Sequence, residues 1–278
     1  MSASFLRSGT LLGHYTSLKS AIAIIENGTI RLNSMSRMND PKETASWILD
    51  VELPSNREIL FNDRCAGDKI SRQCREIAKL ACFSMDSATE IDSPVLHHAR
   101  YGALGRCFAN APMWNHYAEK HQGVCLVFEK SSLERCIVTQ LGKSFVHMGA
   151  VDYKDEPYIV DRWSYAYRYS ADSYLHLGLE AYSDLFVRSA CQEIFFTKQK
   201  DWSYEREFRV LAIDQVEGPV SFRFGNSLRY VILGAEFFKG DDSELSFNRS
   251  RLSELALGRF GIDELEFKNH ILRIKQNI

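Results

Sequence analysis

The chain has 278 residues, of which 45% are hydrophobic and 25% are charged, and its formal net charge is -2. This composition is typical of a globular protein, and it excludes a largely disordered chain and a polycation that binds nucleic acid indiscriminately. The seven cysteines include no Cys-x-x-Cys pair, which argues against a disulfide framework and a zinc knuckle. No apolar run approaches the roughly 18 residues of a membrane helix, and residues 1–9 do not resemble a signal peptide. We therefore expect a cytoplasmic protein without a membrane partner.

The sequence predicts short strands mixed with helices along its whole length. Hydrophobic spacing and turn residues predict strands at 11–15, 29–34, 80–84, 123–128, 145–153, 205–213, 228–233 and 272–275. Helices are predicted at 17–26, about 70–80, 111–119, 172–189 and 243–257, and a turn at 38–41. No strict strand–helix–strand repetition, internal repeat or linker is present. We therefore expect one α+β domain over residues 1–278, with a mixed, largely antiparallel sheet and flanking helices.

A first candidate site lies where the first strand meets the first helix. His14, Thr16 and Ser17 follow one another there, and such a junction presents free backbone N–H groups that suit an anion or a ribose. The alternative is that His14 packs within the strand and Thr16 only caps the helix.

A second candidate site lies on the strand predicted at 205–213. Side chains alternate between the two faces of a strand, so Glu205, Glu207 and Arg209 should share one face. Two carboxylates at positions i and i+2 beside a guanidinium suit substrate chemistry. The alternative is a solvated sheet face with an ordinary ion pair.

Two aromatic segments are further candidates. Residues 113–118 contain Trp114 and Tyr117, which could stack on a flat ring or belong to the core. Residues 153–169 interleave six further tyrosine and tryptophan side chains with basic residues. That pattern grips single-stranded nucleic acid in some proteins and forms a self-packed loop in others. We predict a substrate-side insertion at about 153–170 that is not part of the sheet.

Taken in order, short motifs along the chain resemble a known bacterial family. The motifs are His14–Ser17, Asn39-Asp40-Pro41-x-Glu43, Cys82–Ser84, Met113–Tyr117 with Gly123-Val124, Lys198 with Trp202-x-Tyr204-Glu205-x-Glu207-x-Arg209, and Ile232–Gly234. Their order and spacing resemble the family called domain of unknown function 2971 (DUF2971), over nearly the whole chain.

The same layout resembles ADP-ribosyltransferases, especially DarT-type toxins that modify DNA. This resemblance implies an ADP-ribosyltransferase-like fold and a chain that uses NAD as a substrate without a metal. It implies that Glu207 is catalytic and that Glu205 orients the acceptor. It places His14 and Thr16 on the adenosine-side ribose, Arg37 on the pyrophosphate, and Tyr117 or Trp114 against the nicotinamide. The full set of implied NAD contacts is His14, Tyr15, Thr16, Arg37, Trp114, Tyr117 and Arg209.

The resemblance leaves more than one function open. An ADP-ribosyltransferase would be a toxin or phage-defence effector that modifies nucleic acid or protein, and with water as the acceptor it would be an NAD glycohydrolase. The alternative is a defence module that binds a nucleotide or nucleic acid without turnover. Nucleic-acid cleavage or base excision would also use Glu207. The enzymatic reading predicts that His14 and Glu207 face one cleft, on strands close together in the sheet.

Overall fold

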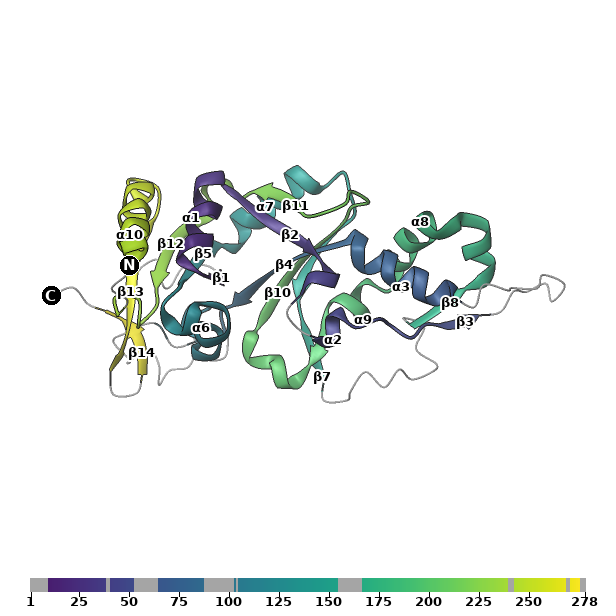
Figure 1. The fold of residues 1–278 in the computed structure, drawn as a ribbon, viewed down its shortest axis with the longest axis horizontal. Helices are drawn as coiled ribbons and strands as arrows, with labels where there is room; N and C mark the ends of the chain where they lie inside the picture. The colour runs from purple at the N-terminus through teal and green to yellow at the C-terminus, as the bar shows by residue number, and fades with distance from the viewer. Residues whose placement is uncertain are drawn as a thin grey trace.

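The computed structural model describes residues 10–38, 41–52, 65–87, 103, 105–154, 167–239, 243–268 and 271–275. The molecule is elongated, and one large sheet runs through it with helices packed along both faces (Figure 1). Within the described ranges, no helix combines the length and apolarity that crossing a bilayer requires.

The main sheet has ten strands in the described part of the chain. In spatial order they are β11 (Val220–Arg223), β2 (Thr29–Ser34), β4 (Ala78–Met85), β1 (Leu11–Thr16), β5 (Val124–Glu129), β12 (Leu228–Leu233), β13 (Gly261–Lys268) and β14 (Ile271–Ile274), with β10 (Glu207–Ile213) and then β6 (Val146–Ala150) extending from β4. The strand pairs are antiparallel except for β12 and β13. The predicted α+β class, with a mixed and mostly antiparallel sheet, is confirmed.

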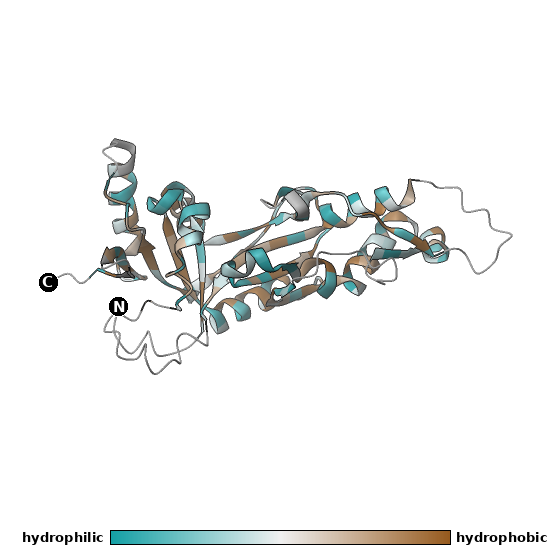
Figure 2. Cartoon of the chain, turned by 90° about the horizontal axis from the view of Figure 1, so that it is seen from below, coloured by the Kyte–Doolittle hydropathy of each residue, from teal (hydrophilic) through white to brown (hydrophobic). Residues whose placement is uncertain are grey.

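Helices cover both faces of this sheet, and on one face a polar region lies between two groups of helices. The helices are α1 (Leu18–Asn27), α2 (Pro41–Thr44), α3 (Ala66–Ile77), α6 (Ala111–Tyr117), α7 (Lys130–Leu141), α8 (Ala171–Ser189), α9 (Cys191–Phe195) and α10 (Ser243–Ala256). On one face, α1, α7 and α10 pack on the largest apolar cluster. On the other face, α6 covers β1 and β5, whereas α3, α8 and α9 cover the far ends of β4 and β10. Apolar residues are concentrated on the strands, as Figure 2 shows.

The first helix illustrates how local sequence sets these boundaries. Ser17 caps α1, because its side chain accepts a hydrogen bond from the Ser20 N–H at 3.1 Å. Gly28 ends the helix in the left-handed conformation, with φ of 63°. Between them, Leu18, Ile22 and Ile25 are buried at helical spacing. The cap of this helix is therefore Ser17 and not Thr16.

The structure corrects several predicted elements. The strand expected at 145–153 is two strands, β6 and β7 (Asp152–Lys154), and the long helix α8 contains a non-helical residue at Gly178, with φ of 76°. The ends of the predicted insertion form small parallel pairings outside the main sheet, because β7 pairs with β9 (Thr197–Gln199) and β8 (Arg168–Ser170) pairs with β3 (Asp50–Glu52). Residues 155–166, the centre of that insertion, and Asn39 and Asp40 of the expected turn lie outside the described residues.

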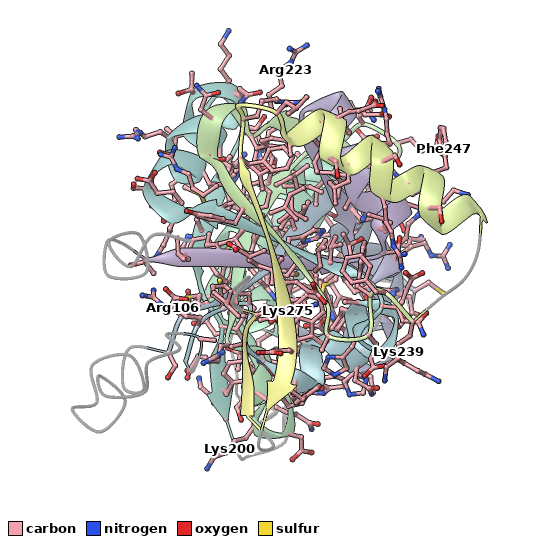
Figure 3. All side chains as sticks on the ribbon, turned by 90° about the vertical axis from the view of Figure 1, so that its left-hand side faces the viewer. Arg106, Lys200, Arg223, Lys239, Phe247 and Lys275 are labelled. Carbon is pink, nitrogen blue, oxygen red and sulfur yellow. The ribbon has the colours of Figure 1, made fainter. Side chains whose placement is uncertain are left out.

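The last elements of the chain, α10, β13 and β14, lie together at one end of the molecule (Figure 3). The strand β13 pairs parallel with β12, and β14 returns antiparallel to it. The sequence did not predict β13 in this region, and it did not predict α7 and β11 elsewhere in the fold.

Candidate functional site

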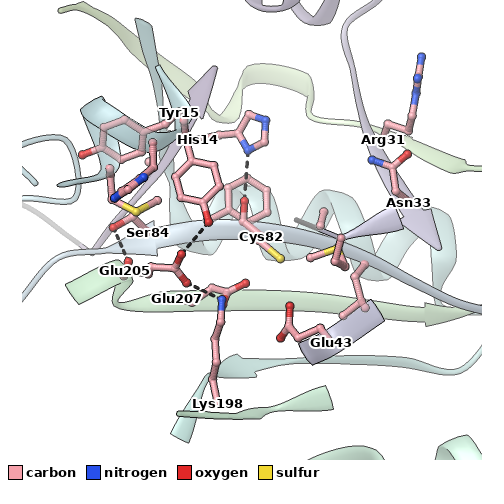
Figure 4. A pocket seen from close by; sticks show the side chains of 18 of the residues that line it. His14, Tyr15, Arg31, Asn33, Glu43, Cys82, Ser84, Lys198, Glu205 and Glu207 are labelled. Atoms are coloured by element: carbon pink, nitrogen blue, oxygen red, sulfur yellow. Dashed lines mark hydrogen bonds and ion pairs between the residues drawn. The ribbon is translucent and has the colours of Figure 1, made fainter. Parts of the chain in front are cut away.

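A pocket of about 390 Å³ lies on the face of the sheet between α6 and the α3–α8–α9 group. Its polar and charged lining comes from nine helices, short 3-10 helices and strands, with residues that include His14, Arg31, Asn33, Arg37, Glu43, Cys82, Ser84, His116, Tyr117, Lys198, Glu205 and Glu207. Figure 4 shows Arg31 and Asn33 on one side of the pocket and Ser84, Glu205 and Glu207 on the other. His14 and Glu207 therefore line one cleft, as the enzymatic reading predicted.

The floor of the pocket is a place where the sheet splits. One edge of β4 pairs with β10 from Ala78 to Ser84. The other edge pairs with β2 only at Lys79 and Leu80, and with β1 only at Ser84 and Met85. The intervening stretch of β4 therefore faces the gap between β1 and β2.

His14 bridges part of this gap. Its Nδ1 lies 3.1 Å from the carbonyl oxygen of Cys82 on β4. Because a carbonyl only accepts, Nδ1 carries the proton and Nε2 is left as an acceptor. Burial lowers the pKa of His14, against the opposing effect of this hydrogen bond, so the ring is neutral at pH 7. A neutral ring with a free acceptor nitrogen can bind a ligand hydroxyl.

Two carboxylates, Glu205 and Glu207, lie at the opposite end of the pocket. Lys198 joins them, since its Nζ lies 2.7 Å from Glu205 Oε2 and 3.6 Å from Glu207 Oε2. Tyr117 donates its hydroxyl to Glu205 Oε1 at 2.7 Å. The exposed fractions of Glu205 and Glu207 are only 3% and 5%.

Arg209 binds Glu207 but does not itself line the pocket. Its Nε and Nη2 donate to the two oxygens of Glu207, each at 2.9 Å. It also donates to Glu43 on α2 and, at 2.8 Å, to the Phe195 carbonyl. Arg209 is fully buried, so its predicted role as an NAD contact is wrong. We call Glu43, Glu205, Glu207, Lys198 and Arg209 the carboxylate wall.

The two carboxyl groups of this wall have pKa values shifted in opposite directions. Burial raises the pKa of Glu205, and the positive charge of Lys198 only partly opposes this effect. Burial acts on Glu207 in the same sense, but the Arg209 guanidinium, the Lys198 charge and a hydrogen bond from Cys82 together outweigh it and lower the pKa of Glu207. Such a pair supplies one carboxyl that readily takes a proton and another that stays ionised.

The wall opposite consists of Arg31 and Asn33 on β2 and Arg37 in the short turn after it, and we call it the arginine wall. Both arginines are exposed. Neither forms an ion pair with a carboxylate in the described part of the chain. Arg37 thus lies at a pocket edge that suits an anionic group.

The predicted aromatic contacts divide into two groups. Tyr117 lines the pocket, beside the exposed His116. Trp114 is fully buried in the core, where its ring meets Tyr15 edge-on at 5.1 Å and its Nε1–H donates to the Phe108 carbonyl at 2.8 Å. The proposed stacking of Trp114 on nicotinamide is therefore wrong.

Two residues beside His14 take no comparable part. Tyr15 borders the pocket, but its ring is buried and its hydroxyl donates to the Cys107 carbonyl at 2.6 Å. Thr16 does not line the pocket. Its expected contact with the ribose is not supported by its position.

The strand-parity argument for Glu205 was also wrong in its mechanism. Glu205 ends a 3-10 helix at Lys200–Glu205, and β10 begins only at Glu207. Arg206 between them has φ of 47°, so the two carboxylates do not belong to one continuous strand. Glu205 is no more exposed than Glu207.

Sequence reasoning missed several pocket residues. Glu43 and Cys82 stand in two of the quoted motifs but received no role, and Lys198 was noted only as a flanking charge. Arg31, Asn33 and His116 carried no sequence signal, because their meaning depends on which elements meet them. Within the described residues no group of three His, Cys, Asp or Glu side chains could hold a metal ion.

One comparison with known proteins gives a match. Residues 113–210 match the model of a family described as protein of unknown function (DUF2971). This range holds Tyr117, Lys198, Glu205 and Glu207, but neither His14 nor the arginine wall. The predicted resemblance to DUF2971 is confirmed for this part of the chain. A search of curated proteins found no match to the sequence.

Proposed function

We propose that the pocket binds NAD and that the protein is an NAD-dependent ADP-ribosyltransferase, the function implied by its resemblance to DarT-type enzymes. One observation carries the proposal. Two buried carboxyl groups with opposite pKa shifts line a pocket whose other wall presents two arginines without a described acidic partner. Cleavage of a glycosidic bond in a phosphate-bearing substrate needs both features.

The lining suits the parts of NAD in order. Arg31 and Arg37 supply cations for the pyrophosphate, and the acceptor nitrogen of His14 suits a ribose hydroxyl. Tyr117 and His116 provide flat rings near the carboxylates, where the nicotinamide would lie. The pocket volume of about 390 Å³ falls within the ~300–1,000 Å³ of small-molecule sites.

The carboxylate wall supports the bond-breaking step. As the bond between nicotinamide and ribose C1′ breaks, its electron pair leaves with nicotinamide and positive charge develops on the ribose. Three carboxyl groups face two cations in this wall, so one negative charge is uncompensated when all five are ionised. Glu207, held ionised by Arg209, is the group placed to stabilise the developing charge.

Glu205 suits the second half of the reaction. An acceptor oxygen or nitrogen attacks C1′ and loses a proton, and a carboxylate with a raised pKa accepts that proton well near neutral pH. The resemblance favours nucleic acid or protein as the acceptor, in a toxin or phage-defence effector. Water as acceptor would make the protein an NAD glycohydrolase.

The test is release of free nicotinamide from NAD, followed by chromatography with and without nucleic-acid or protein acceptors. Glu207→Gln keeps the size of the side chain and one of the two oxygens that accept from Arg209, but it removes the charge. We expect the turnover rate to fall by about 100- to 1,000-fold while NAD affinity changes little. Glu129→Gln, on β5 in an exposed ion pair with Arg229, is the matched control and should keep the wild-type rate.

Two outcomes would contradict the proposal. Wild-type turnover by Glu207→Gln would remove the catalytic assignment. Saturable NAD or ADP-ribose binding by the wild-type protein without any nicotinamide release would favour the non-catalytic binding module.

A further inference from the structure

Arg206 separates the two carboxylates in sequence and has an unusual backbone conformation. Its φ and ψ are 47° and 53°, in the left-handed region that L-residues other than Gly and Asn avoid. Among the described residues with a side chain, only three others, Glu119 to His121, have positive φ, and they form a separate turn. A strained residue next to two candidate catalytic groups calls for a structural reason.

The left-handed backbone makes the junction between two elements. The Arg206 N–H donates to the Ser203 carbonyl at 3.2 Å, which closes the 3-10 helix, and its carbonyl accepts from the Met85 N–H at 2.7 Å, which opens the pairing with β4. The preceding carbonyl, that of Glu205, accepts from the Ser84 hydroxyl at 2.8 Å. The chain therefore changes direction between Glu205 and Glu207.

This change of direction gives the two carboxylates different neighbours. Glu205 approaches from the 3-10 helix and contacts Tyr117 on α6 and Lys198 on β9. Glu207 projects from β10 and contacts Arg209 on its own strand, so that Lys198 is the contact that the two carboxylates share. In a continuous strand, both side chains would leave the same face with one spacing.

The side chain of Arg206 links this junction to residues 105 and 106. Its Nη1 and Nη2 donate to the carbonyls of Gly105 and Arg106, at 3.2 and 3.1 Å. Arg106 forms a buried ion pair with Asp86 at 2.8 Å, and Asp86 accepts from the Leu11 N–H at 3.2 Å. Leu11 begins β1, the strand that carries His14. A continuous set of polar contacts thus links the carboxylates to the first strand.

We infer that Arg206 is a positioning residue for the proposed reaction, which places Glu205 against Tyr117 and Lys198 through its left-handed backbone and fixes that arrangement relative to β1 through its guanidinium. The inference rests on the proposed function for its chemical meaning. The placement itself is measurable without NAD.

Two substitutions separate the contributions of the backbone and the side chain. Arg206→Gly loses the guanidinium but favours the left-handed conformation, whereas Arg206→Ala loses the guanidinium and disfavours that conformation. The readout is the titration of the Glu205 carboxyl carbon by NMR at a temperature where all variants are folded. The groups facing this carboxyl are Tyr117 from α6, Lys198 from β9 and Glu207 from β10.

We expect Arg206→Gly to titrate close to the wild type at Glu205, and Arg206→Ala to shift the Glu205 titration toward that of an ordinary glutamate. In nicotinamide release, kcat should fall on the order of 10- to 100-fold in Arg206→Ala and less in Arg206→Gly, with little change in KM. Arg206→Lys, which keeps a cationic donor, replaces Arg206→Ala in the comparison if that variant does not fold.

Lys120 provides a matched control for backbone strain. It is exposed and has φ of 53°, close to that of Arg206, but it contacts neither carboxylate. Lys120→Ala and Lys120→Gly should differ in melting temperature by roughly 2–4 °C, without a change in the Glu205 titration.

The outcomes separate this inference from the proposed function. A wild-type Glu205 titration in Arg206→Ala would overturn the positioning role, and equal disturbance by Ala and Gly would overturn the part assigned to the left-handed backbone. If the Glu205 titration shifts more in Arg206→Ala than in Arg206→Gly, but the protein releases no nicotinamide, the positioning role is retained and the proposed reaction is rejected.

Discussion

The two walls of the pocket are built in opposite ways. The carboxylate wall is buried, and its charges are already hydrogen-bonded to one another through Lys198 and Arg209. The arginine wall is exposed, and Arg31 and Arg37 have no acidic partner in the described part of the chain. A prearranged wall stabilises charge that appears during a reaction, whereas an open cationic wall gains its partner only when an anion binds. Substitutions in the carboxylate wall should therefore alter folding stability and turnover rate, and substitutions in the arginine wall should alter affinity for the ligand.

Arg209→Ala should have the largest effect on stability. It removes the guanidinium from the buried carboxylate of Glu207 and from the partly buried carboxylate of Glu43, and breaking a buried pair in this way costs about 3–5 kcal/mol of unfolding free energy. The loss should be greatest at neutral pH. Arg209 lowers the pKa of Glu207, so its stabilisation is present above the ordinary glutamate pKa of about 4.3 and disappears as the pH falls through the folded-state value. Urea denaturation at several pH values measures both effects.

Arg229→Ala is the control for that measurement. Its ion pair with Glu129 lies at the surface, where both side chains are at least 32% exposed, and such pairs contribute no more than about 1 kcal/mol. Equal losses of unfolding free energy for Arg209→Ala and Arg229→Ala would show that the ion pairs of the carboxylate wall stabilise the protein no more than a surface pair does.

Single replacement of Arg31 or Arg37 by Ala should have an intermediate effect, confined to binding. Loss of one charge-assisted contact to a phosphate costs about 1.5 kcal/mol, so KM for NAD should rise on the order of tenfold with kcat unchanged. The difference should shrink at high salt, because these side chains are exposed. Arg223→Ala, on the neighbouring strand β11 and outside the pocket lining, should leave KM unchanged. A fall in kcat at constant KM would place these arginines in the chemistry instead.

Tyr117→Phe should have the smallest effect, a shift in pH dependence. The Tyr117 hydroxyl stabilises the ionised form of Glu205, so its removal should raise the pKa of Glu205 further. If Glu205 acts as the base, activity falls below its pKa, and the acidic limb of the rate profile should move to higher pH by roughly half to one unit. A shift to lower pH, or none, would show that Glu205 does not control that limb.

The strands and helices were predictable where local sequence alone determines them. Residues 29–34 form the predicted strand, and Gly28 ends α1 because only a residue tolerant of positive φ fits there. β13 was missed because Ile262, Leu265 and Phe267 do not alternate regularly with polar residues. Its strand conformation comes from parallel pairing with β12, which no local pattern encodes.

The sequence indicated several residues of the pocket, but it was less informative about the role of each residue. Tyr117 and Trp114 are three residues apart on a helix of seven residues, and periodicity over so few turns does not determine which side meets the core. Arg209 was mistaken for a ligand contact because its partner Glu43 lies 166 residues away. Glu205 was assigned to the right pocket for the wrong reason, since nothing about Arg206 as a residue type predicts a left-handed backbone.

The split floor of the pocket also has a mechanical consequence. β4 holds β10 through a ladder of seven residue pairs, but it holds β1 and β2 through two pairs each. Shifting β2 therefore breaks far fewer ladder hydrogen bonds than shifting β10, and the energy needed for local opening differs accordingly between the two edges. We therefore expect any widening of the pocket to move Arg31 and Arg37 more than Glu207 and Arg209. Amide hydrogen exchange should report this asymmetry as fast exchange at the ends of β2 and slow exchange along β10.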